Sequence, residues 1–244
     1  MALLEVRGLG KTFGALRALG GVDVTVRARS FHGLIGPNGS GKSTLLKAIA
    51  GAHFASEGTI TFDGTEITTA TPAERAKRGL SLKFQITAIL PELSVYDNVL
   101  LALQADQPLW TLLRSRSRAA LHTEVMELLE RFLLADLTRD LAGELSHGQQ
   151  QWLEIAMAMA VKPKLLLLDE PTGGMSPEER RVTGELLMPI KQTCALVIVE
   201  HDLDFIKDIC DHLTVLDQGQ VLDDGTVAEI ETSARVQEVY TTRV

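Results

Sequence analysis

The chain has 244 residues, of which 45% are apolar and 23% charged, so it can bury a large core and has an ordinary globular composition. Its net charge of −8 argues against a protein that binds nucleic acid by neutralising phosphates, and we expect no nucleic-acid partner. No apolar run approaches the roughly 20 residues that span a bilayer. Glu5 and Arg7 stand where a signal peptide would need its apolar core, which favours the cytoplasm. The two cysteines, Cys194 and Cys210, are interpreted as buried free thiols rather than a disulfide.

The first ninety residues predict short strands around one helix. Apolar and alternating runs indicate strands at Leu3–Arg7, Val22–Arg27 and Gly33–Ile35, and a helix at Lys42–Ala50. The stretch EGTITFDG alternates as a strand does and ends in an Asp-Gly turn.

From about Pro91 to Val161 the pattern changes to helices. Apolar residues recur on one face of the stretch from Ser117 to Leu134, and charged residues lie on the opposite face. The sequence therefore predicts a helical subdomain at 90–161, inserted into a core formed by 1–89 and 162–244.

Strand and helix signals alternate again after the insertion. KLLLLDE and ALVIVEH indicate buried strands, helices are expected from Ser176 or Pro177 and from Asp202, and HLTVLDQGQVLDDG is typical of a hairpin. The tail from Glu229 reads as a short helical ending. Such alternation favours an α/β fold with a largely parallel sheet and helices on its faces.

The segment GPNGSGKS follows a short apolar strand and opens a helix, and this context is typical of a phosphate-binding loop. Its glycines let backbone N–H groups turn toward a nucleotide, its lysine can reach the β- and γ-phosphates, and its last serine can ligate Mg²⁺. The alternative is a glycine-rich turn that happens to carry a helical lysine. The predicted nucleotide-binding residues are Gly36, Pro37, Asn38, Gly39, Ser40, Gly41, Lys42, Ser43 and Thr44.

Two carboxylates and a histidine follow buried strands that should end at one sheet edge. Asp169 can hold the hydration shell of Mg²⁺, and Glu170 can polarise the water that attacks a γ-phosphate. His201 can hydrogen-bond that phosphate and orient the water. The competing interpretations are a strand-end pair that caps a helix and a surface or capping histidine.

Two further candidates carry weaker signals. Gln85 lies at the junction with the helical insertion, where its amide can touch Mg²⁺ or the attacking water, or can simply be an exposed loop residue. Phe13 can stack on adenine or can be a half-buried residue near the first strand, and the sequence favours neither.

A second phosphate-seeking element lies at Leu145–Gln149. Ser146 is a good N-cap, and Gln149 completes a capping box before a long apolar-periodic helix. A helix start of this kind offers free N–H groups and the positive end of a dipole to an anion. Trp152, in the same helix, is interpreted as a packing residue.

Taken in order, these motifs resemble the ATP-binding subunit of ABC transporters across nearly the whole chain. GPNGSGKS resembles the Walker A loop, LLLLDE the Walker B strand and LSHGQ the signature motif, while Gln85 and His201 match the Q-loop and the switch histidine. The resemblance implies ATP and Mg²⁺ as cofactors. It also implies a P-loop NTPase core with a mostly parallel sheet, an N-terminal antiparallel β region and an inserted helical subdomain.

In that family two subunits pack head to tail, and the signature of one closes on the γ-phosphate held by the other. The resemblance therefore assigns Ser146, His147, Gly148 and Gln149 to the nucleotide of a second ATP-binding subunit. Two residues depart from the family pattern: His147 replaces the usual glycine, and Ser176 stands where the D-loop usually ends in aspartate.

Within the family, FGALRAL, PTGGMSPEE and the ending RVQEVY are similar to subunits that serve branched-chain amino acid and urea uptake, with LSHGQQQWLEIAMAM looking most like the urea type. This resemblance implies a peripheral protein on the cytoplasmic face of the membrane, with integral-membrane permease subunits as partners. The alternatives are the ATPase of an exporter, such as that for lipopolysaccharide, and a soluble ABC ATPase of translation or DNA repair.

Overall fold

The computed structural model describes residues 2–83, 89–105 and 117–242. The chain forms two compact units, the first made of Met1–Leu82, Lys164–Pro171 and Met188–Val244, and the second of Lys83–Pro163 and Thr172–Leu187. The predicted helical subdomain, 90–161, falls inside the second unit, which also contains 172–187. Within the described residues, no helix is long and apolar enough to cross a membrane.

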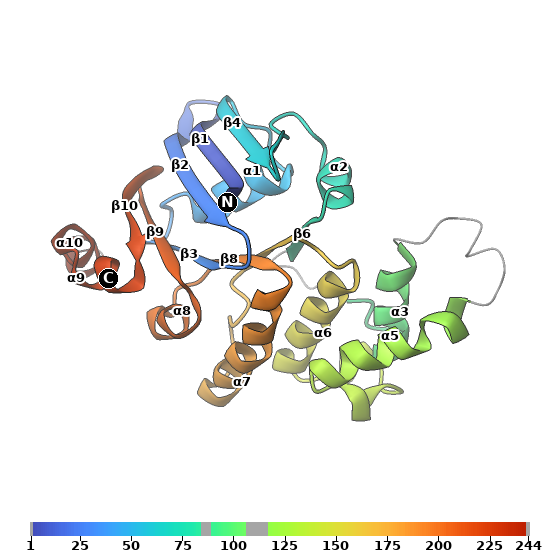
Figure 1. Cartoon of the computed structure of the whole chain (residues 1–244). Helices are drawn as coiled ribbons and strands as arrows, with labels where there is room; N and C mark the ends of the chain where they lie inside the picture. The colour runs from blue at the N-terminus through green and yellow to red at the C-terminus, as the bar shows by residue number, and fades with distance from the viewer. Residues whose placement is uncertain (1, 84–88, 106–116, 243–244) are drawn as a thin grey trace. The chain divides into compact units, whose positions relative to one another are not determined.

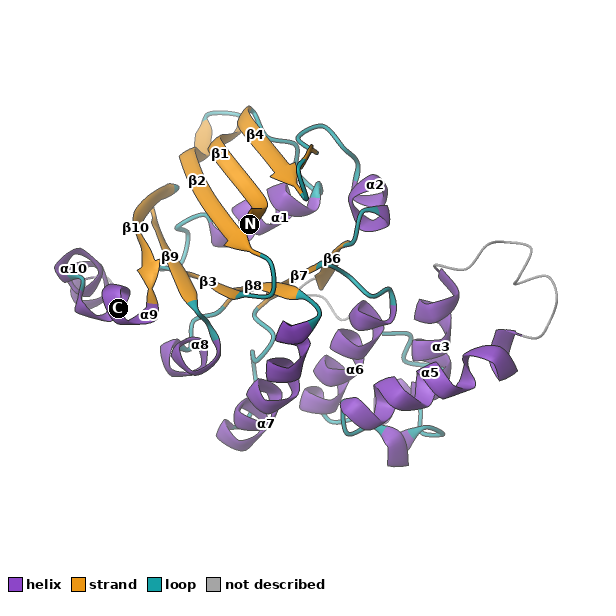
Figure 2. Cartoon of the chain, in the orientation of Figure 1, coloured by secondary structure: helices purple, strands orange, loops and turns teal. Residues whose placement is uncertain are grey.

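An antiparallel sheet forms the start of the first unit. Its strands run in the order β2-β1-β4-β5 (Figures 1 and 2), with bounds β1 Ala2–Phe13, β2 Leu16–Arg27, β4 Glu57–Phe62 and β5 Thr65–Glu66. The predicted Asp-Gly turn joins β4 to β5, with φ of 48° at Asp63 and 72° at Gly64. Positive φ at both central residues matches the twist of the flanking strands.

The second sheet of this unit is mostly parallel. Its order is β10-β9-β3-β8-β7-β6, with bounds β3 Phe31–Ile35, β6 Leu80–Lys83, β7 Leu165–Asp169, β8 Ala195–Val199, β9 His212–Asp217 and β10 Gln220–Thr226. β3 pairs in parallel with β8 and β9, β7 pairs in parallel with β8, and β9 and β10 form the predicted antiparallel hairpin. Every residue of β3, β7 and β8 is buried, as a sheet covered on both faces requires. The predicted α/β fold is confirmed.

Helix α1, Lys42–Ala50, lies in the core of the first unit (Figure 1). The core cluster combines its buried Leu45, Leu46 and Ile49 with apolar side chains of both sheets. The remaining helices of the unit are α2 Pro72–Lys77, the 3₁₀ helix Met188–Gln192, α8 Leu203–Ile209, α9 Val227–Thr232 and α10 Ala234–Thr242. Cys194 and Cys210 are buried free thiols, as predicted.

The second unit is helical. In its described residues the helices are α3 Val95–Ala105, α5 Ser117–Arg131, α6 His147–Ala160 and α7 Pro177–Leu187, with short 3₁₀ turns at Ala135–Leu137 and Ala142–Glu144. α3 contacts both α5 and α6. The predicted apolar face of α5 is buried at Leu121, Val125 and Leu129, so the helical period read from the sequence is correct there.

A buried arginine closes the C-terminal end of α1. Arg75, in α2, is 0% exposed and donates to the carbonyl oxygens of Ala48 and Ile49, each at 2.7 Å. It also donates to the carbonyls of Ala70 at 2.9 Å and Thr68 at 3.0 Å. Burial lowers the pKa of Arg75 to about 10, so the guanidinium stays charged at neutral pH. The cation thus satisfies the last carbonyls of α1 at the negative end of the helix dipole.

We expect Arg75→Met to lower the free energy of unfolding by about 3 kcal/mol, because buried carbonyls lose charge-assisted partners. Urea denaturation followed by circular dichroism measures this loss. The control is Arg78→Met, in which an exposed arginine next to α2 is replaced by the same side chain. An equal effect of the two substitutions would contradict the role given to Arg75.

Candidate functional site

The phosphate-binding loop needs its glycines for backbone geometry. φ is 142° at Gly36, 78° at Gly39 and 105° at Gly41, all in the region that favours glycine. A Cβ on Gly36 would also lie 2.1 Å from the carbonyl oxygen of Leu216. The close approach of the loop to β9 therefore excludes any side chain at Gly36.

The turn between β9 and β10 holds the loop from outside. The amide of Gly219 donates to the carbonyl of Ser40 at 2.9 Å, and the amide of Gly20 donates to the carbonyl of Gly219 at 2.8 Å. Gln218 and Gly219 both have positive φ, 46° and 77°. This turn links the loop to β2, so the antiparallel sheet and the parallel sheet both fix the loop.

Lys42 reaches back over the loop. Its ammonium donates to the carbonyl oxygens of Gly36 at 2.8 Å and Pro37 at 3.0 Å. Burial lowers the pKa of Lys42, and the nearby Glu170 and Asp169 act in the opposite direction. The loop thus holds a desolvated cation at its centre, where an anion would find it.

Asp169 ends β7 beside the start of α1. The Ser43 hydroxyl donates to Asp169 Oδ1 at 3.4 Å. Burial raises the pKa of Asp169, and the neighbouring Glu170 adds to this, while Ser43 and two lysines lower it. A raised pKa means that the ionised carboxylate is held at a cost in the folded chain.

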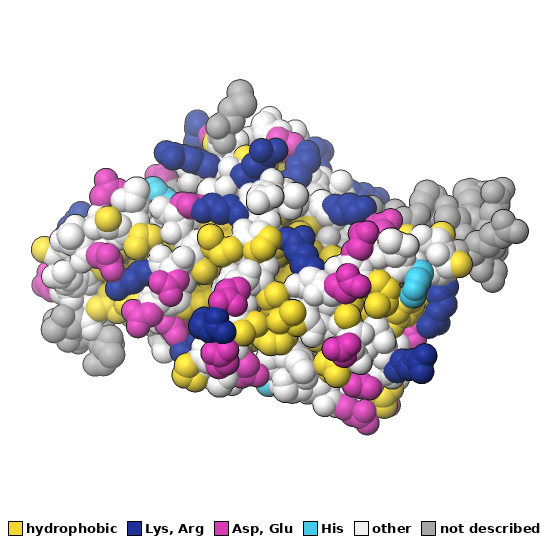
Figure 3. Space-filling model, turned by 60° about the horizontal axis from the view of Figure 1, so that its bottom comes forward, with side chains coloured by type: hydrophobic (Ala, Val, Ile, Leu, Met, Phe, Trp, Pro, Cys, Tyr) yellow, Lys and Arg dark blue, Asp and Glu magenta, His cyan; other side chains and the backbone are white. Residues whose placement is uncertain are grey.

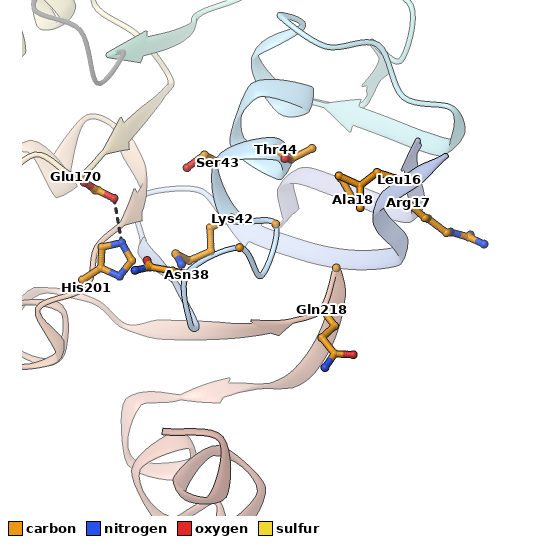
Figure 4. Close-up of a pocket in the computed structure, with 13 residues that line it drawn as sticks. Leu16, Arg17, Ala18, Asn38, Lys42, Ser43, Thr44, Glu170, His201 and Gln218 are labelled. Atoms are coloured by element: carbon orange, nitrogen blue, oxygen red, sulfur yellow. Dashed lines mark hydrogen bonds and ion pairs between the residues drawn. The ribbon is translucent and has the colours of Figure 1, made fainter. Parts of the chain in front are cut away.

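Glu170 and His201 meet at the ends of β7 and β8. Glu170 has a φ of 50°, a conformation that residues with a side chain rarely adopt, and its amide donates to the carbonyl of Val199 at 2.8 Å. Its Oε1 lies 3.0 Å from His201 Nε2 (Figure 4). Since a carboxylate accepts, Nε2 is the donor in this pair. The backbone strain at Glu170 thus accompanies a carboxylate–imidazole pair at the sheet edge.

Lys42, Ser43, Glu170 and His201 line one cavity of about 460 Å³ (Figure 4), and Asp169 lies outside this lining. Its volume is in the range of small-ligand sites. Six predicted loop residues, Glu170 and His201 line it, together with five residues that the sequence reasoning did not identify: Leu16, Arg17, Ala18, Gln218 and Gly219. The first three of these residues lie in the string FGALRAL and the last two in DQGQ. Each string contains a turn, which was the only sequence signal that could have indicated them. Gly36, Pro37 and Ser40 lie in the loop without lining the cavity, and Ser40 is buried.

Comparison with known proteins identifies the family. A model of the ABC transporter family matches residues 19–173. The high-affinity branched-chain amino acid transport ATP-binding protein BraF of Pseudomonas aeruginosa is 32% identical over 98% of this chain and 97% of its own length. The methionine import ATP-binding protein MetN 1 of Burkholderia pseudomallei is 35% identical over 93% of this chain and 66% of its own. The chain belongs to the ABC transporter family. It is therefore an ATP-binding ATPase.

Solved structures agree with this assignment. The ADP conformation of MJ1267, an ATP-binding cassette of an ABC transporter, is 31% identical, with a TM-score of 0.87 over 99% of both chains. The likeness thus covers both units of the ABC ATPase rather than its phosphate-binding loop alone.

Two predicted residues of the ABC site, Phe13 and Gln85, are not among the described residues that line the cavity. Phe13, at the end of β1, is 41% exposed and lies outside the cavity lining. Its ring meets that of His53 edge-on at a centroid distance of 5.3 Å. Gln85 lies outside the described residues.

The ABC signature segment begins α6 in the second unit. Ser146 Oγ accepts from the amide of Gln149 at 3.3 Å, and Gln149 Oε1 accepts from the amide of Ser146 at 3.0 Å. The predicted capping box is confirmed. His147 and Gly148 form the first turn, and Trp152 Nε1 donates to Thr183 Oγ1 at 2.8 Å, which agrees with a packing role.

We expect Asp169→Asn to raise the free energy of unfolding of the nucleotide-free chain at pH 7 by about 1 kcal/mol, as loss of a costly site charge commonly does. Because the pKa of Asp169 is raised in the folded chain, its protonated form stabilises the fold. This contribution is fully present below the unfolded-state pKa of about 4, and it is lost as pH rises through the folded-state pKa. The gain should therefore vanish below about pH 4. Urea denaturation at both pH values measures it, with the exposed Asp204→Asn as control. A destabilised variant at pH 7 would contradict the analysis.

Proposed function

We propose that this chain is the ATP-hydrolysing subunit of an importer that takes up a small polar solute through separate membrane permeases. The observation that carries the proposal is the Glu170–His201 pair, which lies with Lys42 and Ser43 in one cavity. The end-to-end similarity to BraF supports the importer class. On this proposal the chain is a peripheral protein at the cytoplasmic face of the membrane.

The cavity has the parts that phosphoryl transfer to water needs. Backbone N–H groups of the loop and the Lys42 ammonium bind the β- and γ-phosphates of ATP, after Lys42 exchanges the carbonyls of Gly36 and Pro37 for phosphate oxygens. Glu170 accepts a hydrogen bond from the attacking water and polarises it. His201, next to Glu170, orients that water and the γ-phosphate.

A divalent cation fits the oxygen donors beside the loop. The Ser43 hydroxyl and the Asp169 carboxylate lie 3.4 Å apart, and both are ligand types that Mg²⁺ prefers. We propose that they hold Mg²⁺, with Gln85 as a further ligand. The ion neutralises charge on the β- and γ-phosphates when bound.

The signature segment acts, on this proposal, on the nucleotide of a second ATP-binding subunit. Ser146, His147 and Gly148 present the start of α6, where N–H groups and the helix dipole favour an anion. ATP then joins two subunits, and hydrolysis releases them. The second subunit is another copy of this chain or a close relative.

The proposed solute is a branched-chain amino acid or urea. BraF supports the amino acid, and the resemblance of LSHGQQQWLEIAMAM supports urea. MetN, a methionine import protein, has a similar level of identity, so identity alone does not select the solute. We propose that the importer also uses a secreted solute-binding protein, and equilibrium binding of leucine and of urea to that protein distinguishes the two solutes.

The rival function on nucleic acid has less support. The face drawn in Figure 3 carries acidic as well as basic side chains. The net charge of −8 also opposes phosphate-driven binding. Identifying which membrane permease co-purifies with the chain would distinguish an importer from this rival and from an exporter.

We expect Glu170→Gln to reduce ATP hydrolysis at least about 100-fold while ATP affinity changes little, because the amide fills the same space without polarising the water. Phosphate release and nucleotide binding measure the two effects. The control is Glu200→Gln, at the next strand end outside the cavity lining. Hydrolysis by Glu170→Gln near the wild-type rate would contradict the assigned role.

We expect Ser146→Arg to abolish ATP-driven dimerisation and turnover while ATP binding to the isolated chain stays nearly intact. A long cation at the start of α6 occupies the place proposed for the partner's phosphate. The control is Ser146→Ala, which removes the same cap, worth about 1 kcal/mol, without adding bulk. Light scattering and nucleotide titration measure the two effects. Loss of binding to the monomer would contradict the two-subunit site.

A further inference from the structure

His147 makes a specific contact with the segment 173–179 of the same chain, which resembles the D-loop of the family. Its Nε2 lies 2.9 Å from the carbonyl oxygen of Gly173. A carbonyl only accepts, so Nε2 donates its proton in this bond. Glycine, the usual residue at this place in the signature of the family, has no side chain to make such a bond.

The imidazole also fits against the second glycine of the pair. φ is 75° at Gly174, and a Cβ there would lie 3.3 Å from both Cδ2 and Nε2 of His147. Adjacent glycines have the greatest backbone freedom of any residues, so a segment that contains them needs outside contacts to stay ordered. The His147 ring supplies both a hydrogen bond and a packing surface.

The starts of α6 and α7 meet through a second contact. Ser176 precedes α7, and its amide donates to Glu179 Oε2 at 2.9 Å. The amide of Glu179 donates to Ser176 Oγ at 3.2 Å. A Cβ on Gly148 would lie 2.4 Å from Glu179 Oε1, so the carboxylate lies directly against the signature backbone. Hydrogen bonds from Ser176 lower the pKa of Glu179, and His147 adds a smaller effect of the same sign. Ser176, the departure from the family's aspartate, thus serves as a helix cap.

Farther along the two helices a third contact repeats the connection. Trp152 Nε1 donates to Thr183 Oγ1 at 2.8 Å, and Thr183 Oγ1 donates to the carbonyl of Glu179 at 2.7 Å. Thr183 is buried. Figure 1 shows α6 and α7 side by side in accordance with these bonds. The contacts at His147, Gly148 and Trp152 therefore join the signature helix to the D-loop and to the helix that follows it.

We propose that His147 is a positioning residue that clamps the turn 172–175 to the start of α6. The residues 146–148 and 172–176 then form one preformed surface for the nucleotide of the second subunit, a step that rests on the proposed two-subunit function. A surface ordered before association loses less conformational entropy when the subunits close. His147→Gln can keep the donor, and His147→Ala removes it.

The clamp itself is tested in the nucleotide-free full chain by amide hydrogen exchange. The amide of Met175 donates to the carbonyl of Thr172 at 3.1 Å, so its exchange reports the turn. We expect exchange at Met175 and Ser176 to be about five- to tenfold faster in His147→Ala, the effect of one lost hydrogen bond, and to return toward wild type in His147→Gln. Unchanged exchange in His147→Ala would overturn the clamp. Equally fast exchange in both variants would also overturn it, because ring bulk rather than the N–H would then be responsible.

The role in association is tested in the Glu170→Gln background, where ATP persists. We expect His147→Ala to raise the dissociation constant of the ATP-bound dimer about five- to tenfold, with His147→Gln restoring it and ATP affinity of the monomer unchanged. Sedimentation velocity measures the dimer. Equal dimerisation with and without His147 would overturn the positioning role. If Glu170→Gln alone fails to dimerise with ATP, the two-subunit function is wrong, and hydrogen exchange alone decides the clamp.

Discussion

Parallel pairing of β3, β8 and β7 is the constraint on which the site depends. Val199 pairs with Leu34 on one side and with Asp169 on the other, so β7 and β8 end on one rung and β3 ends one residue beyond it. The phosphate-binding loop, Glu170 and His201 begin within two residues of that rung. A slip of one residue would turn every side chain of a strand to the other face. The buried apolar residues of these strands therefore set the positions of the reacting groups, although Asp169 at the end of β7 is the only one of their side chains that we assign to the chemistry.

The same edge of the sheet brings together charged side chains whose ionised forms are destabilised by burial. Burial works against the ionised forms of both Lys42 and Asp169, and each stabilises the other's charge. The Lys42 ammonium also donates hydrogen bonds to two carbonyl oxygens of the loop. A nucleotide with its cation can satisfy all of these groups at once. The folded chain thus holds unfavourable electrostatics that ligand binding relieves, which is a general source of affinity at preorganised sites.

Local pattern was sufficient for the elements that begin and end at strong signals. The predicted bounds of α1, Lys42–Ala50, match the structure, because glycine ends this helix. The strand predicted from ALVIVEH is found as β8, Ala195–Val199, where β-branched and apolar residues are continuous. Contacts between residues that are far apart in the sequence could not be predicted in this way. Gln218 and Gly219 reach the loop from far along the chain, and Arg75 caps a helix that ended 25 residues earlier, at Ala50. Such contacts depend on tertiary pairing that no short window contains.

Two helix starts in this chain are both predicted to hold an anion but differ in how many backbone N–H donors they leave free. α1 begins after Gly41, which has no side-chain cap, so its first N–H groups remain available to a phosphate. At α6, Ser146 and Gln149 take up each other's amides, and the N–H groups of His147 and Gly148 are those left by the cap. A fully wrapped phosphate needs more donors than α6 offers. The signature segment is therefore suited to completing a phosphate site built mainly by another loop, and this donor count is the physical reason to assign it to a partner's nucleotide.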